Sequence, residues 1–168
     1  MVRPEFVLES WRQVRLYAVE AVQEWPETEG AFRLAPEVMT FAEIGRHIAE
    51  AGHILTGILL SGETDYARPG FRAEMQRWSP GIAETAPLAV LAAELDRLVT
   101  VRIEELRGQS PEWWAGMVKK WTGEDMTRLE FLQFVKEHEL THLAQLFACM
   151  RLKGLTPQIG RASCRERV

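Results

Sequence analysis

Two histidines four residues apart, His138 and His142, are the side chains of this sequence best suited to binding a metal ion. In an α-helix this spacing puts both side chains on one face, with their Cβ atoms about 6 Å apart. Both imidazoles can then reach one ion at about 2.1 Å. Apolar residues recur on the same face and place it toward a core: Phe131, Val135, Leu146 and Cys149. We therefore predict that His138 and His142 ligate a divalent transition metal.

A third ligand is expected from a second helical segment. His47 lies on its apolar face, which carries Ile44, Ala51, Ile54 and Ile58. His53 comes six residues later, about 240° around the helix, and is predicted to be a surface or boundary residue. A site of three protein ligands leaves a coordination position open, as catalytic zinc sites do and structural zinc sites do not. The sequence thus favours a metal site built by His47, His138 and His142.

The segment from His138 to His142 also fits H-E-x-x-H, in which a glutamate activates water on zinc. The extended protease motif would need a glycine at position 145 and a histidine at position 148, and this chain has Gln145 and Ala148. A protease is therefore disfavoured. Glu139 lies about 100° around the helix from His138, so two roles stay open: a catalytic base near the metal, or a solvated or interhelical ion-pairing residue.

Two further residues follow along the same helix. Gln145, one turn beyond His142, has two open roles: it hydrogen-bonds a bound cofactor, or it bridges helices. Cys149 is displaced by roughly 10 Å along the axis from His142. A buried thiol is therefore a better interpretation of Cys149 than a fourth ligand.

Four long helical patterns must position these residues, at about 5–25, 40–60, 85–107 and 127–153. The second and the fourth begin with capping boxes, in which Thr40 pairs with Glu43 and Thr127 with Glu130. The segment 63–81 is rich in glycine, proline and charge and is predicted to be a long loop, and no strand is predicted. We expect an all-α protein, a four-helix bundle.

The composition disfavours several classes of function. The 168 residues carry a formal net charge of -4, whereas phosphate binding needs a clustered positive surface, so nucleic acid is disfavoured as a partner. No apolar run approaches the roughly 18 residues of a membrane span, and the first residues lack a signal peptide. Two cysteines give no disulfide framework. A cytoplasmic protein that acts on a small molecule is expected.

The chain is expected to hold one domain, residues 1–158, followed by a tail, residues 159–168. The tail is basic and lacks apolar periodicity. It can be back-translated into a nucleotide sequence that looks like a common sequencing adapter. We interpret it as an assembly artefact, with an ordinary disordered tail as the alternative, and expect no function of Cys164 in either case.

The motifs around the histidines resemble those of the DinB/YfiT-like family. The last helix carries H-x-x-x-H-x-x-Q from His138 to Gln145 and then the exit Arg-Leu-Lys-Gly-Leu-Thr-Pro157. The segment Thr-Phe-Ala-Glu-Ile-Gly-Arg-His47 resembles the family's other ligand segment. In helix order and length the resemblance spans residues 5–157. Where many members have a histidine, or an arginine and a glycine, before the glutamine, this chain has Leu143 and Ala144, so no particular substrate is implied.

The resemblance implies a three-histidine site for zinc, nickel or a similar ion, and a homodimer. It also implies two kinds of chemistry, and both suit an open metal position. One is transfer by a low-molecular-weight thiol held as thiolate, and the other is hydrolysis by water of lowered pKa, with Glu139 as the base. A third hypothesis is a noncatalytic stress or ligand-binding bundle with a structural metal.

Overall fold

The computed structural model describes residues 3–157, and the predicted tail with Cys164 lies outside them. Within this range the chain forms four long helices: α1 (Pro4–Glu24), α2 (Phe41–Leu60), α4 (Leu88–Arg107) and α6 (Arg128–Leu152). The short elements are the 3-10 turns η1 (Glu27–Glu29) and η2 (Met75–Trp78), the helices α3 (Phe71–Glu74) and α5 (Pro111–Ala115), and the strands β1 (Met117–Lys119) and β2 (Asp125–Thr127).

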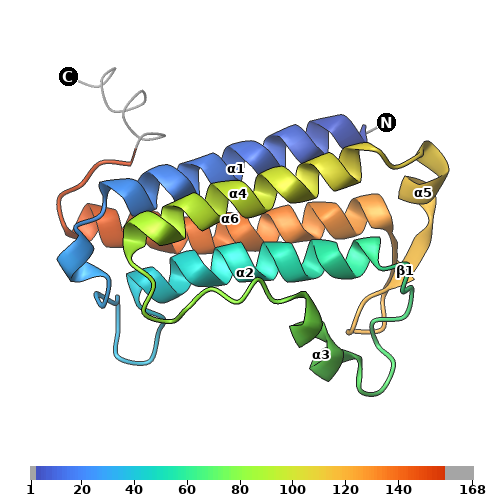
Figure 1. The fold of residues 1–168 in the computed structure, drawn as a ribbon, viewed down its shortest axis with the longest axis horizontal. Helices are drawn as coiled ribbons and strands as arrows, with labels where there is room; N and C mark the ends of the chain where they lie inside the picture. The colour runs from blue at the N-terminus through green and yellow to red at the C-terminus, as the bar shows by residue number, and fades with distance from the viewer. Residues whose placement is uncertain (1–2, 158–168) are drawn as a thin grey trace.

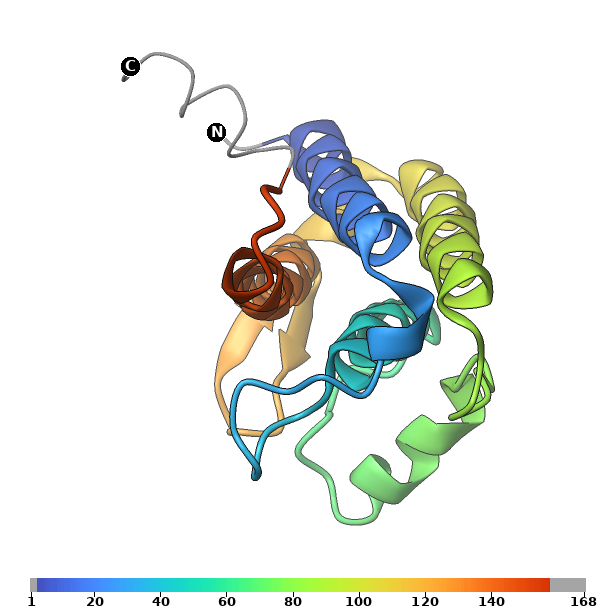
Figure 2. The same ribbon diagram turned by 90° about the vertical axis from the view of Figure 1, so that its left-hand side faces the viewer.

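The four long helices pack as a bundle, which confirms the predicted all-α fold (Figure 1). Seen from one end, they follow one another around the bundle in the order α1, α4, α2 and α6 (Figure 2). Helices α2 and α4 run in one direction, and α1 and α6 run in the other. Because α2 lies beside α6, histidines that are distant in the sequence share one face of the bundle.

The helix ends largely follow the predicted signals. Both capping boxes form, with the Thr40 hydroxyl accepting from the Glu43 backbone and the Thr127 hydroxyl accepting from the Glu130 backbone. Helix α4 begins at Leu88, three residues later than predicted. The reason is Pro87, which disfavours helical geometry in the residue before it. The Glu27 carboxylate accepts a hydrogen bond of 2.9 Å from the free Leu88 N–H.

The prediction that the chain has no strand was wrong. Strands β1 and β2 form a short antiparallel hairpin in which Val118 pairs with Met126. Each strand has only three residues, which is too few for the alternation of apolar and polar residues in a strand to be recognised in the sequence. The hairpin also ties down the loop 63–81, because the Tyr66 N–H donates to the Lys119 carbonyl at 2.8 Å and the Lys119 N–H donates to the Thr64 carbonyl at 2.7 Å.

The core divides into two apolar clusters along the bundle. One holds Trp25, Phe41, Ile48, Leu95 and Leu146, and the other holds Trp11, Leu55, Ile103, Phe131 and Val135. Along α6 the two clusters are separated by Glu139, which is buried although charged. Among the described helices, none has a stretch apolar and long enough to span a bilayer. The fold thus places a charged group in the middle of its core.

Candidate metal centre

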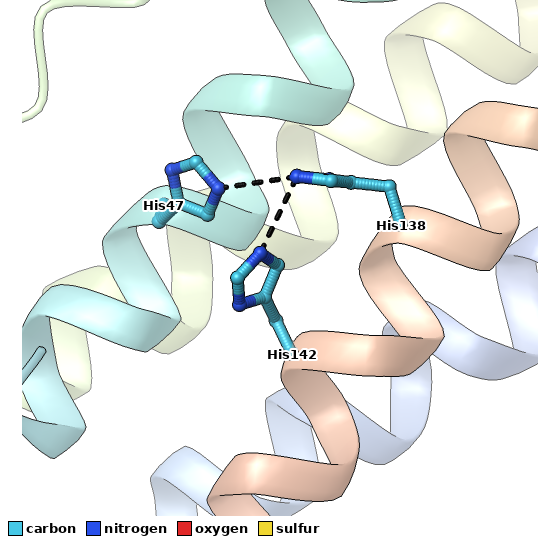
Figure 3. A group of neighbouring side chains, drawn as sticks. All are labelled: His47, His138 and His142. Atoms are coloured by element: carbon cyan, nitrogen blue, oxygen red, sulfur yellow. Dashed lines mark hydrogen bonds between the residues drawn. The ribbon is translucent and has the colours of Figure 1, made fainter. Parts of the chain in front are cut away.

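The three predicted ligands converge between α2 and α6 (Figure 3). The Nε2 atom of His138 lies 3.3 Å from Nε2 of His47 and 3.3 Å from Nε2 of His142. Their ligand atoms all lie within 4.8 Å of one another. Two helices and three side chains therefore present nitrogen atoms to a common point, as the spacing predicted.

This geometry fits a transition-metal ion. Nitrogen ligands at about 2.1 Å are separated by about 3.4 Å along the edge of a tetrahedron around zinc, close to the two distances of 3.3 Å that Nε2 of His138 makes. A neutral imidazole also has one donor nitrogen and one acceptor nitrogen. The Nε2 atom of His138 carries either one N–H or one lone pair, so it cannot make a well-directed hydrogen bond to both neighbours, whereas a cation between the rings would accept a lone pair from each nitrogen.

Gln145 holds the ring of His142. Its Oε1 atom accepts a hydrogen bond of 2.9 Å from Nδ1 of His142. With its proton on Nδ1, the ring keeps a lone pair on Nε2, the atom that faces the other histidines. Gln145 thus orients a candidate ligand, a role that neither of its predicted interpretations contained, although the spacing of three residues after His142 would have indicated it.

The histidines lie at the edge of the core. The apolar residues predicted for the core face of α6 are all fully buried, namely Phe131, Val135, Leu146 and Cys149, but His47, His138 and His142 are only half-buried. A site at the edge leaves room for an exogenous molecule to approach a bound ion, which a site in the packed interior would not.

Burial favours the neutral forms of His47 and His138. It lowers the pKa of His138 to about 4, with a further contribution from the charges of the other two histidines. The pKa of His47 is lowered for the same two reasons, burial first and then His142. Neutral imidazole is the form that binds metal, so these rings are ready to bind an ion at neutral pH.

Glu139 does not join the histidines. Its side chain is fully buried and is paired with Arg15 of α1, whose Nε donates to Oε2 of Glu139 at 3.0 Å. Of the two predicted roles, this is the interhelical ion pair. The structure does not support Glu139 as a catalytic base, because both oxygens of its carboxylate accept hydrogen bonds from the Arg15 guanidinium.

A cavity of about 460 Å³ opens beside His47 and His138. The bundle contributes Ile54, Leu55 and Phe134, and the loop 63–81 and the turn between β1 and β2 close the other side with Tyr66, Phe71, Met75 and Trp121. Its polar lining residues are Glu50, Arg72 and Gln76. Loop 63–81 and Trp121 thus supply part of the cavity wall.

A second cavity, of about 420 Å³, also borders His47. It is lined by the connector between α1 and α2, which includes Arg33, and by the charged α2 side chains Glu43, Arg46 and Glu50. His47 and Glu50 therefore border both a mostly apolar cavity and a charged one.

The remaining candidates have structural positions. His53 is half-buried, as predicted for a boundary residue, and its Nε2 atom lies 3.0 Å from a guanidinium nitrogen of Arg102. Cys149 is a fully buried free thiol, as predicted.

Comparison with solved structures shows the same fold. The chain is similar to YfiT from Bacillus subtilis, described as a probable metal-dependent hydrolase with an unusual four-helix bundle topology, at 19% identity and a TM-score of 0.71, covering 91% of this chain and 89% of that one. It is similar to a DinB-like protein from Bacillus subtilis at 19% identity and a TM-score of 0.68, covering 89% and 92%.

A mycothiol-dependent maleylpyruvate isomerase shares the fold over part of its length. The identity is 19% and the TM-score 0.63, covering 86% of this chain and 61% of the isomerase. None of the curated proteins compared with the chain matches its sequence. The family model of the DinB superfamily, however, matches residues 10–146, which include His47, His138 and His142. By that match the chain belongs to the DinB superfamily.

Proposed function

We propose that the chain is a metal-dependent transferase that activates a low-molecular-weight thiol at His47, His138 and His142. The observation that carries the proposal is the convergence of three imidazoles, two of which line a mostly apolar cavity. Zinc and nickel suit the three nitrogen ligands. A bound divalent ion supplies the positive charge that keeps a thiol deprotonated at neutral pH.

Residues of the chain position the thiol and the electrophile. The three imidazoles leave a coordination position free for the sulfur, and Gln145 fixes the orientation of His142. The proton of the thiol passes to solvent, the sulfur forms a bond to an electrophilic carbon, and the leaving group departs with its electron pair. The apolar cavity beside His47 and His138 holds the electrophile and excludes water from it.

The charged cavity suits the thiol. Low-molecular-weight thiols are polar molecules, and this cavity offers side chains of both signs, including Arg33 and Arg46. Because His47 borders both cavities, a thiol in one and an electrophile in the other would meet at the histidines. The isomerase of the same fold, which is described as mycothiol-dependent, supports a thiol as the cofactor.

A second candidate is metal-dependent hydrolysis, and Glu50 favours it. Hydrolysis needs a base, and Glu50 is the carboxylate that borders both cavities beside His47. Burial raises its pKa, against the opposing charge of Arg46, which moves it toward the range of a general base. YfiT, described as a probable hydrolase, supports this candidate. Glu50 takes the role first assigned to Glu139.

We further propose that the protein acts in the cytoplasm as a homodimer on a small-molecule substrate. The rival to both enzymatic functions is a noncatalytic bundle whose metal is structural. Such a protein would lose its fold with its metal and would not exchange ligands at it.

Titration of the cobalt-substituted protein with 2-mercaptoethanol tests the proposal. We expect a new sulfur-to-cobalt absorption band in the near ultraviolet, and conjugation of the thiol to 1-chloro-2,4-dinitrobenzene. His142→Ala should abolish both, because it removes one of three ligands. Glu50→Gln should leave thiol conjugation intact. An unchanged cobalt spectrum at saturating thiol would overturn thiol activation, and hydrolysis of nitrophenyl esters that is lost in Glu50→Gln would support the second candidate.

A further inference from the structure

We propose that the apolar cavity selects molecules with an apolar body and an anionic head group, and that Arg72 binds the head group. This inference names the substrate class of the site proposed above. It rests on the proposed transferase function only for the reaction of the bound molecule, not for its binding. It concerns recognition, which can be measured without any thiol.

The preference for an apolar body is inferred from the side chains that line the cavity. Aromatic rings form much of it, with Trp121 packed edge to face against Phe134 at 5.5 Å and Tyr66 stacked on Phe71 at 5.2 Å. Met75, Ile54 and Leu55 complete the apolar lining. A cavity of about 460 Å³ lies in the size range of small-molecule sites. Burial of apolar surface against these side chains would supply most of the affinity.

The preference for an anionic head group is inferred from Arg72. Its side chain lines the cavity and, among residues 3–157, has no ion pair, hydrogen bond or aromatic ring as a partner. The neighbouring arginines are engaged, since Arg68 binds Glu63 and Glu74, and Arg77 lies near Glu74 and over the ring of Trp78. Glu63 and Glu74 thus pair with other arginines, and the exposed Arg72 lines the cavity without a counterion in the described part of the chain.

The acidic lining residue does not oppose this assignment. Glu50 also borders the cavity, but it lies on α2, where the charge of Arg46 acts on it. Arg72 lies on α3, outside the bundle (Figure 1). An arginine presents a planar fork that matches a carboxylate or a phosphate in geometry. A ligand held by Arg72 would therefore extend from α3 toward the histidines between α2 and α6.

Calorimetric titration of the zinc-loaded protein with 4-phenylbutyrate and with neutral 4-phenylbutanol tests the inference. We expect the carboxylate to bind about three- to tenfold more tightly, the range of a partly exposed charge-assisted pair, and this preference to shrink as salt is raised. In Arg72→Met the preference should disappear while the alcohol binds as before. Arg77→Met, a matched change on the same segment, should keep the preference.

Two results would overturn the inference. One is equal affinity for both probes in the unchanged protein, or no binding of either at millimolar concentration. The other is a preference that survives Arg72→Met and vanishes when zinc is removed, because the carboxylate would then bind the metal. The titration contains no thiol, so a failure of thiol activation in the cobalt experiment leaves this result unaffected, and the reverse also holds.

Discussion

The Arg15 guanidinium binds both oxygens of the Glu139 carboxylate, and both side chains are fully buried. Arg15 also donates to the Leu95 carbonyl of α4 at 3.0 Å and to the Ile48 carbonyl of α2 at 3.1 Å. One side chain of α1 therefore connects all four long helices. Because Ile48 follows His47 and Glu139 follows His138, the same group fixes the register of the two helices that carry the histidines.

Breaking this pair should destabilise the bundle strongly. We expect Glu139→Gln to lower the free energy of unfolding by about 3–5 kcal/mol, because it leaves a buried guanidinium without its counterion. Urea denaturation measures the loss. The double variant Arg15→Met/Glu139→Leu should recover most of it, since an apolar pair of similar volume replaces the ion pair.

The metal affinity of the double variant separates two roles of the pair. If Arg15 and Glu139 also align the helices, zinc should bind more weakly in a protein that is otherwise as stable as the original. Zinc affinity is measured by competition with a chelating dye. Unfolding of Glu139→Gln at the same urea concentration as the unchanged protein would contradict the structural role altogether.

Gly52 should resist replacement although it lies inside a helix. Glycine to alanine in a helix interior usually stabilises by about 1 kcal/mol. A Cβ atom at Gly52, however, would collide with the Glu139 carboxylate and the Arg15 guanidinium. We expect Gly52→Ala to be destabilising in thermal unfolding, and more so than Gly45→Ala on the same helix, where the new methyl group meets the flexible ends of Leu91 and Val22 at 3.0 and 3.3 Å. Equal melting temperatures for the two variants would refute the close packing.

Local signals explain how much of the fold was predictable. The two capping boxes and the periodic apolar residues act within a few residues of sequence, so the four helices could be predicted with starts and ends within three residues. The meeting of His47 with His138 and His142 could be predicted from helical faces alone. Glu139 was harder, because its partner Arg15 lies 124 residues away and nothing in the local pattern of α1 marks it.

The cavity could not be predicted for a related reason. Its outer wall comes from Tyr66, Phe71, Met75 and Trp121, which lie in segments whose glycine, proline and charge indicate a loop but not its path. Hydrogen bonds between residue 119 and residues 64 and 66 set that path. Such pairings between distant segments are decided by tertiary packing and leave no periodic trace in either sequence.

Gln145 should tune the metal affinity without contacting the ion. Its amide oxygen fixes the tautomer of His142, and loss of such a partner typically weakens metal binding by about 10- to 100-fold. We expect Gln145→Ala to weaken zinc binding to that extent, measured by chelator competition. Gln133→Ala on the same helix is the matched control, because Gln133 contacts Glu137 rather than a histidine. Equal zinc affinity in both variants would show that the hydrogen bond is incidental.

His53 should make the protein less stable in mild acid. Burial, followed by the charge of Arg102, lowers its pKa from 6.5 to about 4. Between these values the unfolded chain binds a proton that the folded chain does not, so the contribution of His53 is complete above pH 6.5 and is lost as the pH falls toward 4. The variant His53→Gln removes this proton while keeping an acceptor for Arg102.

Urea unfolding of the metal-free proteins from pH 8 to pH 4.5 should show a smaller loss of stability on acidification in the variant. His47 and His138, whose pKa values are also lowered, act in the same direction in both proteins and cancel in the comparison. Parallel stability curves for the two proteins would mean that Arg102 and burial do not hold His53 neutral.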